Sequence, residues 1–322
     1  MTTAQETLIG NDVNLAAQLL GAGKLVAIPT ETVYGLAANM FCEDAVNQIF
    51  SVKQRPATNP LIAHIHSVES LTGIVTDIPQ KAAMLMQAFW PGPLTLLLPK
   101  NQQVPNVVTA GLPNVAVRMP NHPLTLALLK KVGFPLVAPS ANPYTYISPT
   151  NAMHVKKMLN GKIPYVLDGG PCTKGIESTI VGFKDGVPAM YRMGAINMED
   201  IENVIGKITL AITEKAIAPG MHIKHYSPIT PLVVSNNLEQ DILKYRNHNI
   251  GVITYNSYTP LLPHEQQLLL SEDNDFKTAG ANLYAAMHTM DGKGYDLIIA
   301  RKFPQAGIGL ALNDRLNRAK AT

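Results

Sequence analysis

The sequence predicts an α/β protein made of two unequal domains. Short apolar strands alternate with amphipathic helical segments along the whole chain, a pattern typical of helices packed on a sheet. The length of 322 residues is about twice that of a typical single domain. The alternation stops once, in a stretch rich in proline and glycine, which separates residues 1–205 from a smaller unit at residues 232–322.

Residues 1–205 are expected to form a twisted mixed sheet with helices. The segments 94–98 and 115–119 follow one another as adjacent strands, which leaves room for antiparallel pairing in the sheet. The expected strands are residues 25–29, 61–65, 94–98, 115–119, 136–139, 165–168, 178–183 and 189–192. The expected helices are residues 13–20, 44–52, 80–89 and 151–159.

Residues 206–231 are expected to be a linker between the domains. They carry Pro219-Gly220, Pro228 and Pro231 and have no long periodic run, as is usual for an extended connector. The pattern then resumes as a small doubly wound, Rossmann-like α/β domain. Its expected elements are strand 232–235, helix 238–246, strand 250–255, helix 275–290, strand 296–300 and helix 310–319.

The composition excludes several classes of protein. Hydrophobic residues make up 46% of the chain, too many for a disordered protein, and no apolar run approaches the ~18 residues of a membrane span. The first residues, MTTAQETLIGNDVN, lack the basic start and apolar stretch of a secretory signal. Cys42 and Cys172 lack metal-ligand spacing and are expected to be free thiols. We therefore expect a soluble cytoplasmic protein with no membrane contact.

The net charge of +3 hides a basic stretch. Residues 53–162 contain ten basic residues but only Glu69 and Asp77 as acids, which suggests a surface or cleft for phosphates of a nucleotide or a nucleic acid. The alternative is a set of solvated helix faces, favoured for 130–131 and 156–157 because cations late in a helix offset its dipole. The ten are Lys53, Arg55, Lys81, Lys100, Arg118, Lys130, Lys131, Lys156, Lys157 and Lys162.

Two polar motifs stand at the ends of expected elements. Residues 29–35, Pro-Thr-Glu-Thr-Val-Tyr-Gly, directly follow an apolar strand, where α/β sheets collect their ligands. The alternative is an ordinary turn closed by Gly35. Lys53 and Arg55 lie two positions apart at a helix end and can converge on one polyphosphate, although helix ends also favour cations for structural reasons.

Further polar groups lie beside expected strands. Ser140 and Asn142 follow a strand and suit phosphate oxygens, or serve simply as turn residues. Arg118 stands between apolar neighbours in a strand, so it either faces solvent or pairs with a buried carboxylate or phosphate. The segments 177–179 (Glu-Ser-Thr) and 192–194 (Arg-Met-Gly) add to this set.

Several familiar sites are excluded. Residues 21–25 lack the G-x-x-x-x-G-K-[ST] pattern of a phosphate-binding loop, and His64 and His66 do not by themselves make a zinc site. Ser140 does not lie in a G-x-S-x-G elbow, so it is not an obvious nucleophile. Residues 307–309 (Gly-Ile-Gly) lack the full G-x-G-x-x-G pattern, so cofactor binding in the second domain is not expected.

Taken together and in order, these segments resemble the threonylcarbamoyl-AMP synthases, whose catalytic domain is called YrdC-like. The motifs shared with that domain are Pro29-Thr30-Glu31-Thr32-Val33-Tyr34-Gly35, Lys53-Gln54-Arg55-Pro56, Asn59-Pro60-Leu61, Arg118-Met119-Pro120, Ser140-Ala141-Asn142, Ser148-Pro149-Thr150, Glu177-Ser178-Thr179 and Arg192-Met193-Gly194. The motifs of the longer, two-domain form are Pro219-Gly220-Met221, His225-Tyr226-Ser227-Pro228 and Asn313-Asp314-Arg315-Leu316. The resemblance spans nearly the whole chain.

The resemblance implies a nucleotidyltransferase that condenses L-threonine, bicarbonate and ATP into L-threonylcarbamoyladenylate and pyrophosphate. A downstream transferase would then place the threonylcarbamoyl group on adenosine beside the anticodon of tRNAs. Family enzymes use Mg²⁺ with the ATP, and no protein metal ligands are implied.

Roles carry over to this chain position by position. The residues implied to contact threonine are Thr32, His64, Arg118 and Ser178. The residues implied to hold ATP are Lys53, Arg55, Asn59, Thr109, Ser140, Asn142, Ser148, Arg192 and Tyr226. Lys53 and Arg55 are the expected catalytic pair, because nucleotidyl transfer needs charge neutralisation more than a covalent nucleophile.

Two segments leave alternatives open. The linker either tethers the domains or folds Lys224, His225 and Tyr226 over the site as a lid that holds back water. Residues 143–147 (Pro-Tyr-Thr-Tyr-Ile) depart from the small glycine-containing turn usual in the family, which weakens the assignment of Ser148.

Two other functions are weighed against this one. A non-catalytic RNA-binding module would explain the basic stretch equally well but needs no threonine pocket. A carbamoyl-adenylate enzyme of hydrogenase maturation shares the domain type but carries zinc-finger cysteines that this sequence lacks. The sequence leaves direct tRNA contact and the role of the small domain undecided.

Overall fold

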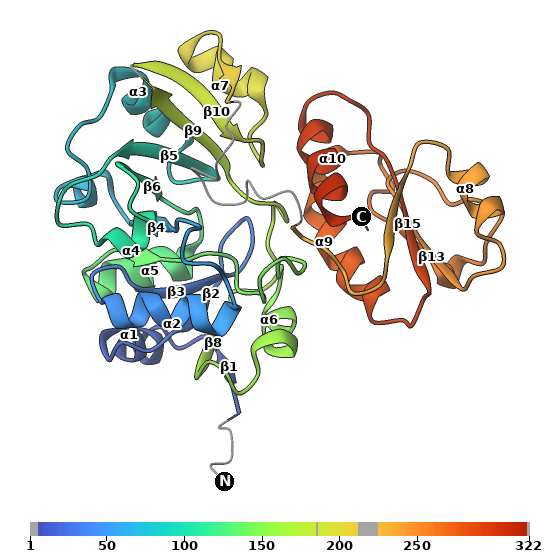
Figure 1. Cartoon of the computed structure of the whole chain (residues 1–322), viewed down its shortest axis with the longest axis horizontal. Coiled ribbons are helices and arrows are strands. Elements are labelled where there is room, and N and C mark those ends of the chain that lie inside the picture. Colours follow the sequence, from blue (N-terminus) through green and yellow to red (C-terminus); the bar gives the residue numbers. More distant parts are fainter. Residues whose placement is uncertain (1–5, 185, 212–224, 321–322) are drawn as a thin grey trace.

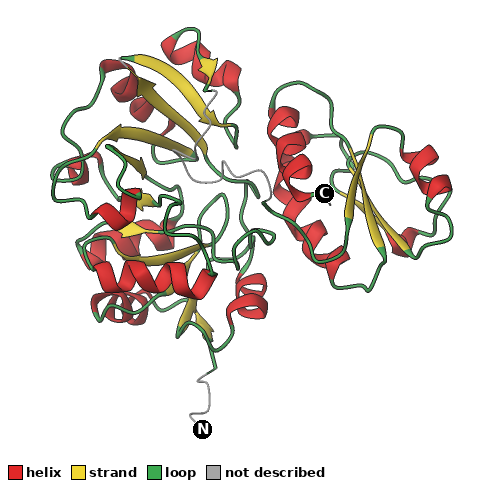
Figure 2. Ribbon diagram, in the orientation of Figure 1, coloured by secondary structure: helices red, strands yellow, loops and turns green. Residues whose placement is uncertain are grey.

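Strands from the amino-terminal part of the chain pair into one mixed sheet. The computed structural model describes residues 6–184, 186–211 and 225–320, which form two α/β domains around two separate sheets (Figures 1 and 2). In spatial order the first sheet contains β1 (Leu8–Gly10), β8 (Tyr165–Leu167), β2 (Val26–Ile28), β3 (Gly35–Asn39), β7 (Leu136–Val137), β4 (Ile62–His64), β6 (Asn114–Arg118), β5 (Leu94–Pro99), β9 (Thr179–Lys184), β10 (Val187–Arg192) and β11 (Thr209–Leu210).

The pairing directions confirm the expected mixed sheet. β5 runs antiparallel to β6, with Leu96 opposite Val117, and parallel to β9 on its other side. β4 runs parallel to β6, and this register sets His64 directly beside Arg118. The pairing of adjacent strands therefore brings two of the residues assigned to threonine together.

Helices cover this sheet, and their ends follow local sequence signals. Asp12 caps the first helix, because its Oδ1 accepts the backbone N–H of Asn14 at 2.7 Å. A glycine at position 133, with φ of 71°, ends the helix that begins at Pro123. The helices are α1 (Val13–Gly21), α2 (Glu43–Lys53), α3 (Gln80–Phe89), α4 (Asn106–Thr109), α5 (Pro123–Val132), α6 (Ala152–Leu159) and α7 (Met198–Ile205), with a 3₁₀ turn η1 (Val68–Leu71).

Strand β3 was not expected from the sequence. Gly35, the last residue of the expected turn segment, begins this buried strand, whose glycine and alanines carry little strand propensity. A Cβ on Gly35 would stand 3.0 Å from the Cβ of Ala138, so a larger residue would push β3 and the chain after β7 slightly apart. Residues 29–34 form the turn before β3, and tertiary contact continues the chain from Gly35 as a strand.

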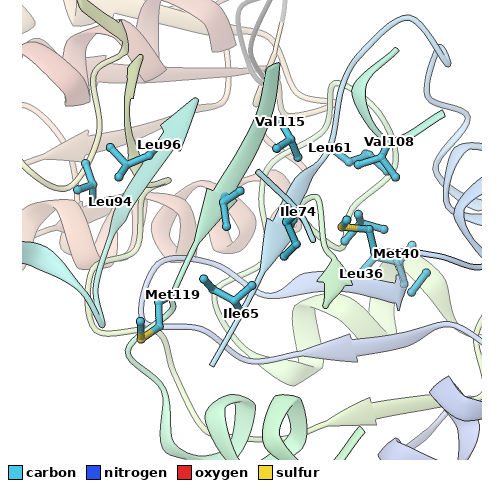
Figure 3. Close-up of a cluster of buried hydrophobic side chains, with 14 of the residues drawn as sticks. Leu36, Met40, Leu61, Ile65, Ile74, Leu94, Leu96, Val108, Val115 and Met119 are labelled. Carbon is cyan, nitrogen blue, oxygen red and sulfur yellow. The ribbon is translucent and has the colours of Figure 1, made fainter. Parts of the chain in front are cut away.

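Apolar side chains from both ends of the first sheet form its core. Leu36 of β3, Leu94 of β5 and Val115 of β6 belong to one buried cluster with residues from the loops between them (Figure 3). Cys172 belongs to this cluster, and Cys42 packs against it. Both are free thiols, as expected. This cluster holds the strands that carry the candidate site.

The second sheet is fully parallel, as a doubly wound domain requires. Its order is β12 (Leu232–Ser235), β15 (Leu297–Arg301), β13 (Ile250–Thr254) and β14 (Gln267–Leu269). The helices are α8 (Leu238–Lys244), α9 (Phe276–Asp291) and α10 (Ile308–Ala319), with a 3₁₀ turn η2 (His264–Gln266). α8 packs on one face of the sheet, and α9 and α10 lie on the other, toward the large domain (Figure 1).

The two domains share an apolar core. Val33, Ile147 and Ile176 of the large domain are buried in one cluster with Leu283 of α9 and Leu312 of α10. No helix among the described residues is long and apolar enough to cross a membrane. Of the expected linker, Thr209–Leu210 pairs with β10 as an edge strand. Pro219-Gly220-Met221 and Lys224 lie outside the described residues.

Candidate active site

A cavity of about 50 Å³ lies where the first sheet meets the second domain. Eight of the residues assigned to ligands line it, together with His225 of the expected lid: Thr32, Arg55, His64, Arg118, Ser140, Ser178, Arg192 and Tyr226. Five do not reach its wall: Lys53, Asn59, Thr109, Asn142 and Ser148. The remaining lining is Thr30, Val33, Gly35, Leu61, Ile62, Ala138, Pro139 and Glu177.

The turn after β2 presents Thr32 to the cavity. The Thr30 hydroxyl donates to the Val33 carbonyl at 2.6 Å and accepts the backbone N–H groups of Thr32 and Val33, each at 3.2 Å. This side-chain bonding fixes the turn without a helix or a ladder. The Thr32 hydroxyl accepts a hydrogen bond from Nη1 of Arg118 at 2.9 Å, so the turn and β6 meet at the site.

Arg118 is buried and faces inward, and its partner is Glu31. Arg118 Nη2 lies 2.7 Å from Glu31 Oε1, an ion pair in distance although its angle is not that of a hydrogen bond, and both side chains are 5% exposed. Glu31 Oε2 also accepts the backbone N–H of Asn121 at 3.1 Å. The sequence predicts a buried anion as the partner of an inward-facing Arg118, but it did not identify Glu31. The signal that could have found it is the cost of an unpaired buried arginine, which calls for a nearby carboxylate.

His64 is a neutral group beside Arg118. Burial, and then the charge of Arg118, lower its pKa from 6.5 to about 3. Its Nδ1 lies 3.1 Å from the Ile62 carbonyl, a distance at which a protonated Nδ1 donates. A neutral imidazole can read a hydroxyl or an amine without repelling the neighbouring guanidinium.

Ser178 directly precedes β9, and Arg192 ends β10, the other strand of the same hairpin. Arg192 Nη2 donates to the Ser178 hydroxyl at 2.9 Å, and Arg192 Nε donates to the Ser178 carbonyl at 3.0 Å. The Ser178 hydroxyl also lies 2.7 Å from that of Thr95. A Cβ on Gly194 would meet the backbone of residues 177–179, so this glycine permits the close approach that sets Arg192 beside Ser178.

Lys53 and Arg55, the expected catalytic pair, occupy different places. Lys53 ends α2 fully buried, and its Nζ donates to the carbonyls of Ser140 and Asn142, which anchors that turn from behind the cavity wall. Burial, and then the charge of Arg55, hold the pKa of Lys53 well below its usual value. Arg55 lines the cavity, with its Nη2 donating to the Pro60 carbonyl at 3.0 Å.

The other assigned residues outside the wall are buried near it. Asn59 has neither side-chain atom hydrogen-bonded among the described residues, and Thr109 ends α4 with its hydroxyl 3.4 Å from Lys100 Nζ. Asn142 donates to the Tyr146 carbonyl at 2.8 Å. The Ser148 hydroxyl donates to Glu177 Oε1 at 2.8 Å, so in this conformation it is turned to a carboxylate.

His225 and Tyr226 of the linker close the cavity. Tyr226 is 1% exposed, and its ring centre lies 4.1 Å from that of His225 and 5.6 Å from that of Tyr284. Its φ of 64° is uncommon for a residue with a side chain, which shows that surrounding contacts fix the linker here. Burial, and then the charge of Glu177, raise its pKa to about 12, so its hydroxyl keeps the proton.

Residues 143–147, which depart from the family pattern, are where the linker binds. The Ser227 N–H donates to the Thr145 carbonyl at 2.7 Å, and Tyr144 packs edge-on against His225 with ring centres 6.0 Å apart. The Tyr146 hydroxyl donates to Asp291 of α9. The bulkier loop therefore contacts both the linker and the second domain.

The second domain holds Glu177, a residue of the cavity wall, in place. The sequence did not predict these contacts. Arg315 Nε of α10 donates to Glu177 Oε2 at 2.8 Å, and Arg315 Nη2 donates to the Met193 carbonyl at 2.7 Å. The Tyr284 hydroxyl of α9 donates to Glu177 Oε2 at 3.0 Å. Burial would raise the pKa of Glu177, but Arg315 and Arg192 outweigh burial and keep it lowered and charged.

Comparison with known proteins identifies the family. The family model described as "Telomere recombination" matches residues 18–194, and the model described as "Threonylcarbamoyl-AMP synthase, C-terminal domain" matches residues 196–321. The threonylcarbamoyl-AMP synthase of Pyrococcus abyssi is 41% identical over 95% of this chain and 93% of its own length. The chain belongs to the threonylcarbamoyl-AMP synthase family. The synthase of Bacillus subtilis is also 41% identical, over 98% of this chain and 95% of its own length.

Solved structures confirm the two-domain fold. The structure of P. abyssi Sua5 complexed with L-threonine is 40% identical and covers 97% of both chains with a TM-score of 0.90. A variant of that protein with a histidine and the next tyrosine replaced by alanine matches with a TM-score of 0.89 at 39% identity, over 97% of this chain and 96% of its own. The YrdC-like domain followed by a Rossmann-like domain is thereby confirmed.

Proposed function

We propose that this enzyme condenses L-threonine, bicarbonate and ATP into L-threonylcarbamoyladenylate and pyrophosphate, as a nucleotidyltransferase. One observation carries the proposal: Thr32, His64 and Arg118 share a buried cavity with two more arginines, Arg55 and Arg192. Family membership, and a relative solved with L-threonine, support the same substrate. A carboxylate site beside a polyphosphate site is what this condensation needs.

The chemistry divides between the two halves of the cavity. Arg118 keeps two N–H groups beyond its contacts with Glu31, Thr32 and the Gly92 carbonyl, and these would bind the threonine carboxylate. The threonine amine attacks the carbon of bicarbonate, and loss of water leaves a carbamate. A carbamate oxygen then attacks the α-phosphorus, and the bond to the departing pyrophosphate breaks. Arg55 and Arg192 would offset the charge that builds on the phosphates.

Mg²⁺ would enter this site as the ATP complex. Among the described residues, no group of three or more His, Cys, Asp or Glu side chains could hold a metal ion. Glu177, which lines the cavity, already pairs with Arg315, and Glu31 pairs with Arg118. The donor set therefore suits a metal carried by phosphate oxygens, and such an ion would supply charge neutralisation on the triphosphate.

The linker acts as a lid in this proposal. The remaining volume of about 50 Å³ is far below the ~300–1,000 Å³ of ordinary ligand pockets, so ATP can enter only after His225 and Tyr226 move away. Once the lid closes again, water is excluded from the carbamate and the adenylate, which both decompose easily.

The decisive test is pyrophosphate release from ATP with and without its co-substrates. Release should require threonine and bicarbonate together, and the adenylate should be recovered as a threonylcarbamoyl nucleotide by mass spectrometry. L-Valine, which is close in size to threonine but lacks the hydroxyl, is the matched control substrate. Release that is independent of threonine would overturn the proposal.

An RNA-binding module is the weaker alternative, because the basic stretch is only partly on the surface. Lys53, Arg55 and Arg118 are buried, with exposures of 1%, 7% and 4%, and so cannot track an RNA backbone. We further propose that the product passes to a tRNA threonylcarbamoyl transferase and that the reaction takes place in the cytoplasm. Direct RNA contact through the remaining lysines stays a proposal, tested by salt-dependent tRNA binding.

A further inference from the structure

A second cavity, of about 340 Å³, lies in the carboxy-terminal domain and shares no residue with the active site. Its walls are the segments that follow three strands: Asn236 after β12, Tyr255 after β13, and Arg301 with residues 302–305 at the end of β15. These strands are parallel, so their carboxyl ends meet at one edge, where α/β sheets bind ligands. We propose that this cavity binds the phosphate group of a small phosphorylated ligand.

Two cations without acidic partners line the cavity. Arg301 and Lys302 are both half-buried, and no described carboxylate lies within ion-pair distance of either one. Arg301 Nη1 donates to Asn256 Oδ1 at 3.3 Å, and its guanidinium carbon lies 5.3 Å from the centre of the Tyr255 ring. These contacts hold the guanidinium in place and leave further N–H groups for a phosphate.

Two buried hydroxyls lie at the ends of strands that lead to this cavity. Ser235 and Thr254, each 1% exposed, end β12 and β13, and neither hydroxyl has a hydrogen-bond partner among the described residues. Ser235 pairs with Arg301 in register, and Ile253 pairs with Ala300, so Thr254 comes level with Arg301. Partners in parallel strands project to the same face, so both hydroxyls share a face with the Arg301 side chain. Neither residue lines the cavity itself, so the two hydroxyls lie behind its wall, on the face of the sheet that carries Arg301.

The helix that follows β15 begins just after the loop that lines the cavity. α10 begins at Ile308, directly after the loop that lines the cavity, and no side chain caps its amino terminus. The positive end of a helix dipole favours an anion at that end. The two cations therefore line the cavity, and the start of α10 lies just beyond the loop that lines it, without the glycine pattern of a dinucleotide site.

The proposal is tested by amide hydrogen exchange on the full chain with inorganic phosphate, AMP and adenosine. Phosphate and AMP should both slow exchange in residues 302–310, whereas adenosine should not. Protection by AMP at much lower concentration than by phosphate would identify a nucleotide as the preferred source. Peptides of the active site are separate, so binding there does not obscure the result.

Matched variants assign the effect to the cavity. Arg301→Ala with Lys302→Ala should raise the concentration for half-protection by about tenfold or more, since each cation donates charge-assisted hydrogen bonds. Lys244→Ala with Arg246→Ala removes the same charge from exposed positions of this domain and should change nothing. Arg301→Gln, which removes the charge but keeps part of the aliphatic stem, serves if the double variant does not fold.

Three results would overturn the proposal. One is no protection of residues 302–310 by phosphate or AMP at millimolar concentration. Another is an equal loss of protection in both double variants, because that would reflect the net charge of the domain and not the cavity. The third is protection by an RNA oligonucleotide but by neither small molecule, which would make this edge a nucleic-acid surface.

Discussion

Arg118 is bonded within the fold and keeps further N–H groups for a ligand. Its ion pair with Glu31 and its bond to Thr32 hold the guanidinium in a buried position before any substrate binds. Burial, and then the charge of Arg118, lower the pKa of the His64 imidazole and keep it neutral. A preorganised fork loses little entropy when it binds a carboxylate.

Arg118→Ala should weaken threonine binding by about tenfold to a hundredfold and leave ATP binding nearly unchanged. The reason is the loss of charge-assisted hydrogen bonds to the threonine carboxylate. Separate calorimetric titrations with threonine and with a non-hydrolysable ATP analogue measure the two affinities. Glu31→Gln is the control, because it keeps the guanidinium and removes only its internal partner. Equal losses of both ligands in Arg118→Ala would contradict the assignment.

At the scale of elements, the linker and the loop 143–147 are bonded to each other beside the site and form the lid of the proposed function. Ser227 pairs with Tyr146 as an isolated parallel bridge, and the neighbouring Tyr226 packs 5.2 Å from the guanidinium of Arg315. The lid is therefore held by backbone bonds on one side and by α10 on the other.

Tyr226→Ala should uncouple ATP consumption from product formation. Without the ring, water can enter the closed site, so pyrophosphate release should continue while the yield of threonylcarbamoyladenylate falls several-fold. The ratio of pyrophosphate to adenylate in one time course is the measurement. Tyr245→Ala, a half-buried tyrosine beside α8, is the matched control. Unchanged pyrophosphate release together with unchanged adenylate yield would exclude the lid role.

A histidine pair joins α6 to α9 and is expected to make the domain contact depend on pH. The rings of His154 and His288 stack with centres 4.1 Å apart, and His288 Nε2 lies 3.2 Å from the Ser148 carbonyl. Burial is the main cause that lowers their pKa values from 6.5 to about 4 and about 3, respectively. Lys157 adds to the lowering at both rings, whereas Asp291 opposes it at His288.

Acidification from pH 7.5 to 5 should loosen this contact. Because both pKa values are lowered in the folded chain, the unfolded chain takes up more protons below 6.5. The contribution of the neutral histidine pair to the free energy of unfolding is therefore fully present above pH 6.5 and is lost as the pH falls below it. Thermal unfolding midpoints across this range measure it, and His154→Gln with His288→Gln should flatten the slope. An unchanged slope in that variant would rule out the pair as the cause.

At the scale of the whole molecule, the second domain completes the active site. Arg315 is 1% exposed and reaches across the interface to Glu177, next to the cavity residue Ser178. The shared apolar core holds α9 and α10 against the large domain, so Glu177 keeps its partners. The small domain thus supports one wall of the candidate active site.

Arg315→Ala should destabilise the chain by about 3–5 kcal/mol, because it leaves the Glu177 carboxylate buried without its cation. Denaturant unfolding measures the change, and the rate of pyrophosphate release should fall with it. Arg315→Met combined with Glu177→Gln removes both charges and should recover most of the stability. Arg246→Ala, an exposed arginine of the same domain, is the control. A loss no larger than that of the control would show that the ion pair is unimportant.

The sequence by itself determined the two α/β domains, the mixed first sheet and most of the residues that meet at the cavity. Strand periodicity and local motifs carry that information, because each depends on neighbours within a few positions. Only the tertiary structure decided that Glu31 pairs with Arg118, that Gly35 begins a strand, and that Arg315 secures Glu177. The two ion pairs join residues that are distant in the chain, and the strand at Gly35 is set by packing. Burial in a shared core makes these contacts favourable, and no local sequence pattern encodes that burial.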